Sequence, residues 1–170
     1  MASFPAWTAP VYEVNGFHVG MSFDQAVALA EDLGGVCERE VLRHGAMVTA
    51  NCLFPTCVDG DGQGECRDAS TPAPALELGG QAIVRIGLKS GEVSATLSKI
   101  AIAFDGDTDK VARRMVEKYG APFSDTTDFE GKTWSHARRM HWRSGREGVG
   151  LLRSINTITL TLDPPLDKPS

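Results

Sequence analysis

The chain has 170 residues, 42% of them hydrophobic, and a formal net charge of −5. This length and apolar content suffice for one domain or two small fused ones. The negative charge argues against a general nucleic-acid-binding protein, and no apolar run approaches the roughly eighteen residues that a membrane-spanning helix needs. The first residues lack the basic and apolar regions of a signal peptide, so we expect either a cytoplasmic protein or an exported chain with a new start Met.

Residues 14–35, VNGFHVGMSFDQAVALAEDLGG, predict an extended segment, a tight glycine turn and an amphipathic helix. Ser22 is placed to cap the helix, and Gln25 is placed to complete a capping box. Gly34 and Gly35 predict the end of the helix. The helical spacing of the small and apolar residues predicts a narrow face that packs on a sheet, formed by Ala26, Leu29, Ala30 and Leu33.

The same pattern recurs 86 residues later. Thr108 takes the place of Ser22, residues 95–104 form an extended apolar segment as residues 12–19 do, and Gly120 precedes a break at Ala121-Pro122. We therefore predict a diverged tandem repeat. Residues 1–74 would form a first strand-helix unit with a cysteine-rich loop, and residues 75–170 a second unit with a C-terminal meander, together in one compact fold.

The stretch GMSFDQAVALAEDLGG, and the later DTDKVARRMVEKYGAP followed by Trp134, resemble the helical signature of small outer-membrane-assembly lipoproteins of the SmpA/OmlA type. The tandem arrangement is similar to that of β-lactamase-inhibitor proteins, which share this α+β plan. The resemblance implies a protein that binds other proteins in the cell envelope, and it brings no catalytic residue. The chain departs from the lipoprotein pattern because it has no lipobox cysteine near its start and because it carries an additional cysteine loop.

Four cysteines lie in the first half of the chain. Cys37 follows the first predicted helix, whereas Cys52, Cys57 and Cys66 lie in a segment rich in Gly, Asp, Pro and Thr. We favour two disulfides, Cys52 with Cys57 across a Pro-Thr turn and Cys37 with Cys66, among the three connectivities that four cysteines allow. A four-thiolate zinc site and reduced, buried thiols are the alternatives, and the lack of CxxC spacing counts against zinc. Disulfides favour the periplasm or the cell exterior.

The loop also contains DGDGQG at residues 59–64, which matches the start of a calcium-binding loop. The match fails further on, where Ser70 stands in place of the bidentate Glu, and we interpret the segment as a solvated Gly-rich turn. His136 and His141 are five residues apart and would lie on opposite faces of a strand. We therefore expect no metal ion and no cofactor.

Strand patterns dominate the second half. Residues 84–89 and 94–104 predict a hairpin around Ser90-Gly91, and residues 132–143, 149–153 and 156–163 predict a meander. In the last of these strands three threonines alternate with three aliphatic residues, so one face should be polar and the other buried: Thr157, Thr159 and Thr161 against Ile158, Leu160 and Leu162.

Charge is uneven along the chain. Residues 132–153 hold six Lys or Arg and one acid, a charge of +5 that leaves −10 for the rest. We predict that this meander binds an acidic partner, with tryptophans as anchors among arginines. The alternative is that the arginines line the solvated face of an edge hairpin while the tryptophans point into the core. The predicted partner-binding residues are Trp134, Arg138, Arg139, Trp142, Arg143 and Arg146.

The sequence thus predicts an α+β fold with two helices packed on one face of a mostly antiparallel sheet. The function we expect is that of a non-enzymatic protein-interaction module of the bacterial envelope, periplasmic or secreted, that binds a protein partner and no nucleic acid. Two alternatives remain, an enzyme whose site has no recognised motif and a metal or ligand sensor built on the cysteine-rich loop. No motif for phosphate binding, serine hydrolysis or zinc proteolysis is present.

Overall fold

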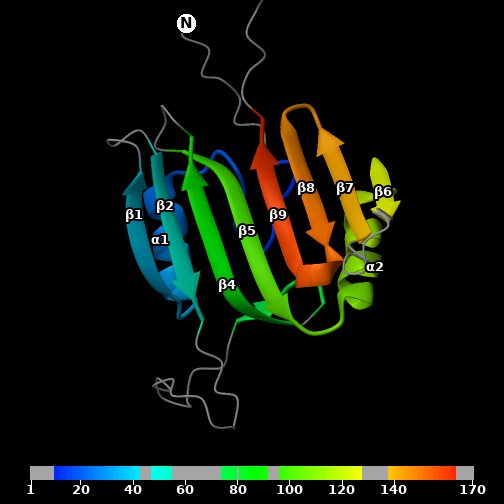
Figure 1. The fold of residues 1–170 in the computed structure, drawn as a ribbon, viewed down its shortest axis with the longest axis horizontal. Helices are drawn as coiled ribbons and strands as arrows, with labels where there is room; N and C mark the ends of the chain where they lie inside the picture. The colour runs from blue at the N-terminus through cyan, green and yellow to red at the C-terminus, as the bar shows by residue number, and fades with distance from the viewer. Residues whose placement is uncertain are drawn as a thin grey trace, which may run out of the picture.

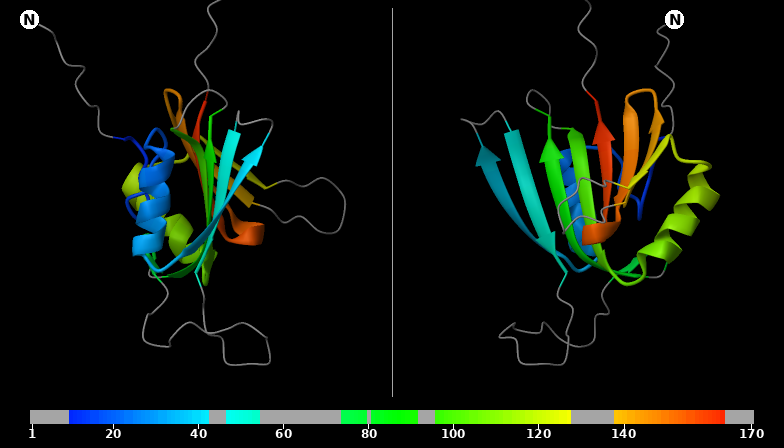
Figure 2. Two further views of the ribbon diagram at one scale, coloured as in Figure 1. Left: turned by 90° about the vertical axis from the view of Figure 1, so that its left-hand side faces the viewer. Right: turned by 45° about the vertical axis from the view of Figure 1, so that its right-hand side comes forward.

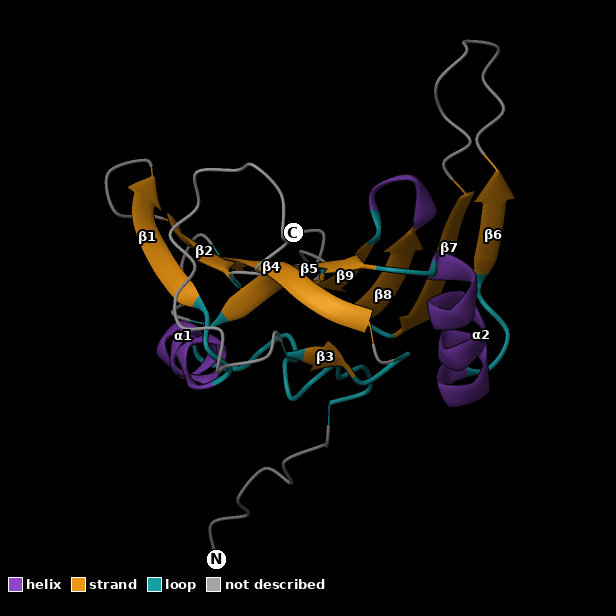
Figure 3. Ribbon diagram, turned by 90° about the horizontal axis from the view of Figure 1, so that it is seen from below, coloured by secondary structure: helices purple, strands orange, loops and turns teal. Residues whose placement is uncertain are grey.

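The computed structural model describes residues 10–42, 47–54, 74–79, 81–91, 96–127 and 138–163. Within these residues two α-helices lie on one side of a twisted antiparallel sheet of nine strands, which confirms the predicted α+β fold (Figures 1 and 2). The outer strands of the sheet bend away from the helices (Figure 3). No described helix is long and apolar enough to cross a membrane.

Helix α1 (Phe23–Asp32) begins as the sequence predicts. The Ser22 hydroxyl accepts a hydrogen bond from the Gln25 N–H at 3.0 Å, and the Gln25 side chain accepts one from the Ser22 N–H at 3.3 Å. This completes the capping box. The helix ends at Gly34, whose positive φ of 95° suits glycine. The buried face includes the predicted alanines together with Phe23 and Val27, which the predicted stripe left out.

Helix α2 (Thr108–Tyr119) is capped one residue earlier than expected. The Asp107 carboxylate accepts a hydrogen bond from the Asp109 N–H, so Asp107, and not Thr108, is the N-cap. Val111 and Met115 are fully buried, and the helix ends at Gly120 with φ 82°.

The sheet runs in the order β1-β2-β4-β5-β9-β8-β7-β6, and β3 pairs with the first residues of β4. The bounds are β1 Val36–Leu42, β2 Met47–Leu53, β3 Ala75–Leu76, β4 Gln81–Ser90, β5 Leu97–Asp105, β6 Ser124–Thr127, β7 Arg138–Ser144, β8 Glu147–Leu152 and β9 Thr157–Leu162. A short 3₁₀ helix, η1 (Arg153–Ile155), joins β8 to β9. The predicted β4–β5 hairpin and the β7–β8–β9 meander are therefore confirmed within the described residues.

Because side chains alternate along each strand, the buried aliphatic side chains of the central strands point to the helix side of the sheet. Ile86 and Leu88 of β4 pair with Ile102 and Ile100 of β5, and these pair in turn with Ile158 and Leu160 of β9. All six are at most 2% exposed, and they form one core with the buried faces of both helices. The predicted division of β9 into aliphatic and threonine faces is confirmed.

Each helix is followed in the chain by strands that run inward from one edge of the sheet, and the two halves meet where β5 pairs with β9. This order fits a duplicated unit, but the repeat itself stays a prediction. One part of the predicted correspondence is wrong. Residues 12–19 do not form a strand equivalent to β5, because Val14 and Phe17 close a tight turn through a single bridge.

The cysteines pair differently from our prediction. Cys37 of β1 lies directly opposite Cys52 of β2 in the sheet register, and the two form a disulfide. The predicted pairing of Cys52 with Cys57 and of Cys37 with Cys66 is therefore wrong. A four-thiolate zinc site is also wrong for the oxidised chain, because two of the thiols are bonded to each other. Cys57 and Cys66, like the calcium-like segment at residues 59–64, lie outside the described residues.

The disulfide should contribute measurably to stability. The bond closes a loop between residues 15 apart, and a loop of this length is worth about 3 kcal/mol through the lost entropy of the unfolded chain. In urea titrations we expect the free energy of unfolding of the C37A/C52A variant to be about 3 kcal/mol lower than that of the oxidised protein. Under reductant the two proteins should differ by at most about 1 kcal/mol, the cost of the small cavity at buried Cys52.

Candidate site on the open face of the sheet

The sheet surface opposite α1 and α2 carries no described element except the short η1, which lies on this side where β8 leads into β9 (Figure 2), and we call this surface the open face. Figure 1 looks onto this face, with both helices behind the sheet. Val36 of β1 and Leu53 of β2 are cross-strand partners on it, and they are 43% and 56% exposed. Apolar side chains of this size exposed in adjacent positions are typical of an interaction surface.

The strand register arranges the open face in rows that cross the strands. The central row holds small side chains on four neighbouring strands, so it forms a floor that we call the transverse trough: Gly87 of β4, Ala101 of β5, Thr159 of β9 and Gly150 of β8. A Cβ placed on Gly87 would meet its nearest atoms at 3.8 Å, an ordinary van der Waals distance, so a methyl group would fit there without displacing a neighbour.

Basic residues occupy the rows on either side of the trough. Lys89 and Lys99 are cross-strand partners on one side. Arg85 and Arg139 lie on the other side, with Ala103, Thr157 and Leu152 between them in the register. Among the described residues, neither lysine nor Arg85 has a carboxylate within ion-pair distance. A chain of net charge −5 thus carries a strip of positive charge on this face.

A hollow of about 510 Å³ lies at the β5 to β7 end of the trough, and we call it the basic hollow. Lys99 and Arg139 supply its charge, and Ser124, Thr159 and Thr161 supply hydroxyl groups. Ammonium, guanidinium and hydroxyl groups together are suited to hold an oxyanion such as a carboxylate.

His141 lies against the floor of this hollow. Its ring is close to two glycines of β8, because a Cβ on Gly148 would come within 3.0 Å of His141 Nε2 and one on Gly150 within 3.7 Å of His141 Cδ2. Thr161 Oγ1 borders the same space at 2.9 Å from the Gly148 position. The glycines therefore let the imidazole and a hydroxyl approach the strand backbone.

Two of the predicted partner-binding arginines lie on the open face. Arg139 and Arg143 flank His141 on β7 and are exposed, and Arg143 pairs with Asp163. Arg146 lies in the β7–β8 turn, where its Nε donates to the Asp163 carbonyl at 2.8 Å. Trp134 and the side chain of Arg138 lie outside the described residues.

Trp142 is a correction to the predicted site. It alternates with the arginines of β7 and is only 2% exposed on the helix side of the sheet. Its indole N–H donates to the Gly120 carbonyl at 2.8 Å, and its ring makes an edge contact with Tyr119, whose phenol pKa is raised by burial. Trp142 is therefore a core residue and cannot anchor a partner.

The sequence pattern missed the basic residues of the central strands. Arg85, Lys89 and Lys99 are separated along the chain from the arginine-rich meander, and only the pairing of β5 with β9 brings the two groups onto one surface. The available signal was their alternation with buried aliphatic residues, as in RIGLK at residues 85–89.

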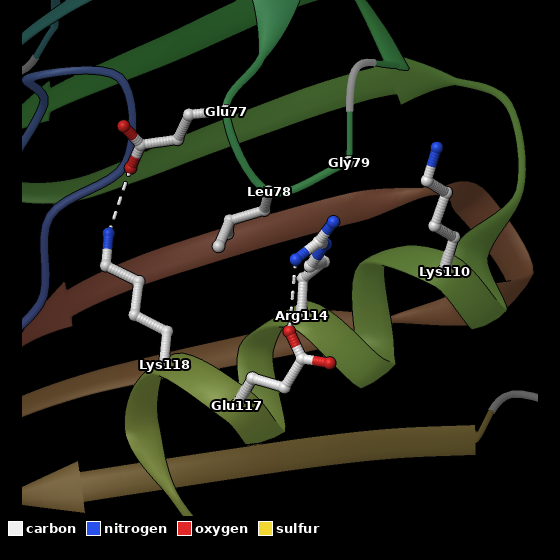
Figure 4. Close-up of a pocket in the computed structure, with 7 residues that line it drawn as sticks. All are labelled: Glu77, Leu78, Gly79, Lys110, Arg114, Glu117 and Lys118. Carbon is white, nitrogen blue, oxygen red and sulfur yellow. Dashed lines mark hydrogen bonds and ion pairs between the residues drawn. The ribbon is translucent and has the colours of Figure 1, made fainter.

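A second hollow, of about 600 Å³, lies on the helix side between α2 and the turn after β3 (Figure 4). Its charges largely neutralise one another, because Lys118 pairs with Glu77 and Arg114 pairs with Glu117. Burial acts to lower the pKa of Lys118, but the hydrogen bond and the charge of Glu77, with contributions from Tyr119, raise it overall. These ion pairs hold four of the five charged side chains that line this hollow.

The described residues include no group of three or more His, Cys, Asp or Glu side chains arranged to hold a metal ion. Ser124 and His141 are opposite each other across β6 and β7. No hydrogen bond joins these two described side chains.

Comparisons with protein-family models, with curated proteins and with solved structures find no match to this chain. The geometry of the open face is therefore the basis for the proposals below, and the resemblance to the SmpA/OmlA-type lipoproteins stays a prediction.

The core position of Trp142 predicts a stability defect. Trp142→Phe removes the hydrogen bond to Gly120 and part of a buried side chain, so we expect the free energy of unfolding to fall by about 1–3 kcal/mol in urea titrations. Arg85→Gln, at an exposed position on β4, should change it by less than about 0.5 kcal/mol. Equal stability of Trp142→Phe and the parent protein would contradict the core placement.

The two glycines of β8 predict different responses to alanine. A methyl group on Gly148 must displace His141 or Thr161, so Gly148→Ala should shift the His141 imidazole resonances in NMR spectra and cost about 1 kcal/mol or more. Gly150→Ala meets its nearest atom at 3.6 Å and should be neutral or slightly stabilising. Indistinguishable spectra and stabilities for the two variants would contradict the position of His141.

Proposed function

We propose that the protein is a non-enzymatic protein-interaction module of the bacterial envelope, and that it binds an acidic protein partner through the open face of the sheet. The observation that carries the proposal is the one-sided construction of the sheet. Both helices pack on one surface, and the described part of the opposite surface combines exposed apolar side chains with an excess of cations.

The open face is better suited to binding another molecule than to catalysis. Enzyme sites are usually deep and mostly apolar, with a few converging polar groups. The basic hollow instead continues into the small-residue row of the trough, and its described polar side chains are Lys99, Arg139, the His141 imidazole and the hydroxyl groups. Such a surface complements a negatively charged partner and accelerates its association by electrostatic attraction.

The Cys37–Cys52 disulfide supports the envelope part of the proposal. Disulfides persist in oxidising compartments, whereas the cytosol keeps thiols reduced. Because the bond joins the strand β1 to β2 at the edge of the sheet, an oxidising compartment would also keep the apolar pair Val36 and Leu53 in place at the end of the open face.

The test is site-specific photo-crosslinking in the organism that makes the protein. A photoreactive benzoyl-phenylalanine replaces Leu53 or Thr157 on the open face, or the exposed Arg113 or Ala28 on the helices as controls. We expect covalent adducts with one acidic protein from the first two positions and none from the controls. Adducts from the helix positions alone, or a partner of basic character, would overturn the proposal.

A further inference from the structure

The transverse trough has dimensions that restrict what can bind in it. Adjacent strands are about 4.8 Å apart, so the row from β4 through β5, β9 and β8 to β7 extends about 19 Å. The two basic rows are four residues apart along the strands, which is about 14 Å. The floor between them consists of Gly87, Ala101, Thr159 and Gly150, so another chain can come close to the sheet along this line.

Charge limits the trough to the centre of the sheet. Continued across β2 and β1, the central row reaches Asn51 and then Glu38, and the neighbouring row reaches Glu40. These carboxylates repel an anionic segment. At the other end the row closes with His141 of β7 and Ser124 of β6, which can form hydrogen bonds. An acidic occupant is therefore attracted only between β4 and β7.

We propose that the trough binds an extended acidic segment of about six residues from the partner protein, lying across the strands. This inference rests on the proposed function and identifies the chemistry of the partner. Successive side chains of an extended chain point in opposite directions. Carboxylates at successive positions therefore reach Lys89 and Lys99 on one side and Arg85 and Arg139 on the other, and 19 Å accommodates about six residues at 3.3 Å each.

A helix fits this geometry less well. A helix with its side chains is 10–12 Å in diameter. It would fill nearly the whole distance between the two basic rows, and the lysine and arginine side chains already occupy part of that space. The basic hollow lies at the β5 to β7 end of the trough, and its hydroxyl groups at Ser124, Thr159 and Thr161 can donate to a carboxylate there.

The test uses the full chain, labelled with ¹⁵N, and two synthetic peptides at constant ionic strength. We expect acetyl-Glu₆-amide to shift the backbone amides of Gly87, Ala101, Thr159 and Gly150, and acetyl-Gln₆-amide to leave them in place. Shifts along α2, at Lys110 and Arg114, would overturn the proposal. Inorganic phosphate that displaces the Glu₆ peptide at equal ionic strength and equal total charge would also overturn it, because the site would then hold a small anion.

Two matched pairs of variants distinguish a peptide that binds within the trough from one that is held only by non-specific electrostatic attraction. Ala101→Leu fills the floor without changing charge, and we expect it to weaken Glu₆ binding at least fivefold, whereas Ala28→Leu on the exposed side of α1 should have no effect. Lys99→Glu should weaken binding at least threefold, while Lys110→Glu on α2 should change it less than twofold. Equal binding by Ala101→Leu and the parent protein would show attraction without a fitted segment and would overturn the proposal.

The same variants keep this proposal distinct from the proposed function. If crosslinks from Leu53 persist when the Ala101→Leu variant is used in cells, the partner binds the open face but not the trough, and only the present inference fails. If neither open-face position forms a crosslink in the parent protein, the proposed function itself fails, whatever the peptide measurements show.

Discussion

The pairing of β5 with β9 is the constraint on which the rest of this structure depends. It joins the strands that follow α1 to those that follow α2, and it aligns Ile100 with Leu160 and Ile102 with Ile158 in the fully buried centre of the core. Because a shift of one residue would turn every side chain to the other face, this register also determines the opposite surface. Lys99 and Thr161 are brought together there by the same alignment that buries the isoleucines. The core and the open face are thus two results of one register.

The local elements were predictable because their signals are local. The capping box at Ser22, the threonine and aliphatic alternation of β9 and the strand pairing around Ser90-Gly91 each depend on residues a few positions apart, and the structure has all three. The predictions were wrong where two residues or two local structures fitted the sequence pattern equally well. Asp107 took the N-cap from Thr108, since both residue types can cap a helix. The turn between Val14 and Phe17 replaced a predicted strand, because apolar residues in an eight-residue segment do not distinguish the two.

The disulfide and the basic face could not be predicted from local patterns. Cys37 and Cys52 pair because β1 and β2 form a hairpin whose register places them opposite each other, whereas the prediction considered the short Pro-Thr turn next to Cys52 and not the two strands. Arg85 and Lys89 are likewise about fifty residues from Arg139 in the chain, so their common surface depends on the order of five strands. Trp142 shows the opposite case. Its position in an arginine-rich segment suggested an anchor, but alternation on a strand requires that the neighbour of exposed Arg143 points inward.

The glycines on the open face lower the stability of the folded chain, and contacts with neighbouring side chains explain only one of them. Glycines inside strands lose more conformational entropy and contribute no side-chain contacts, which weakens a strand by roughly 0.5–1 kcal/mol each relative to alanine. Gly87, Gly148 and Gly150 nevertheless occupy three positions on the open face of central strands, and at Gly87 and Gly150 a methyl group would fit without a close contact. At Gly148 the approach of His141 and Thr161 explains the glycine. At Gly87 no described neighbour does, and close approach of the proposed partner segment is one of the reasons for which glycine is found inside strands, beside bulges and tight bends.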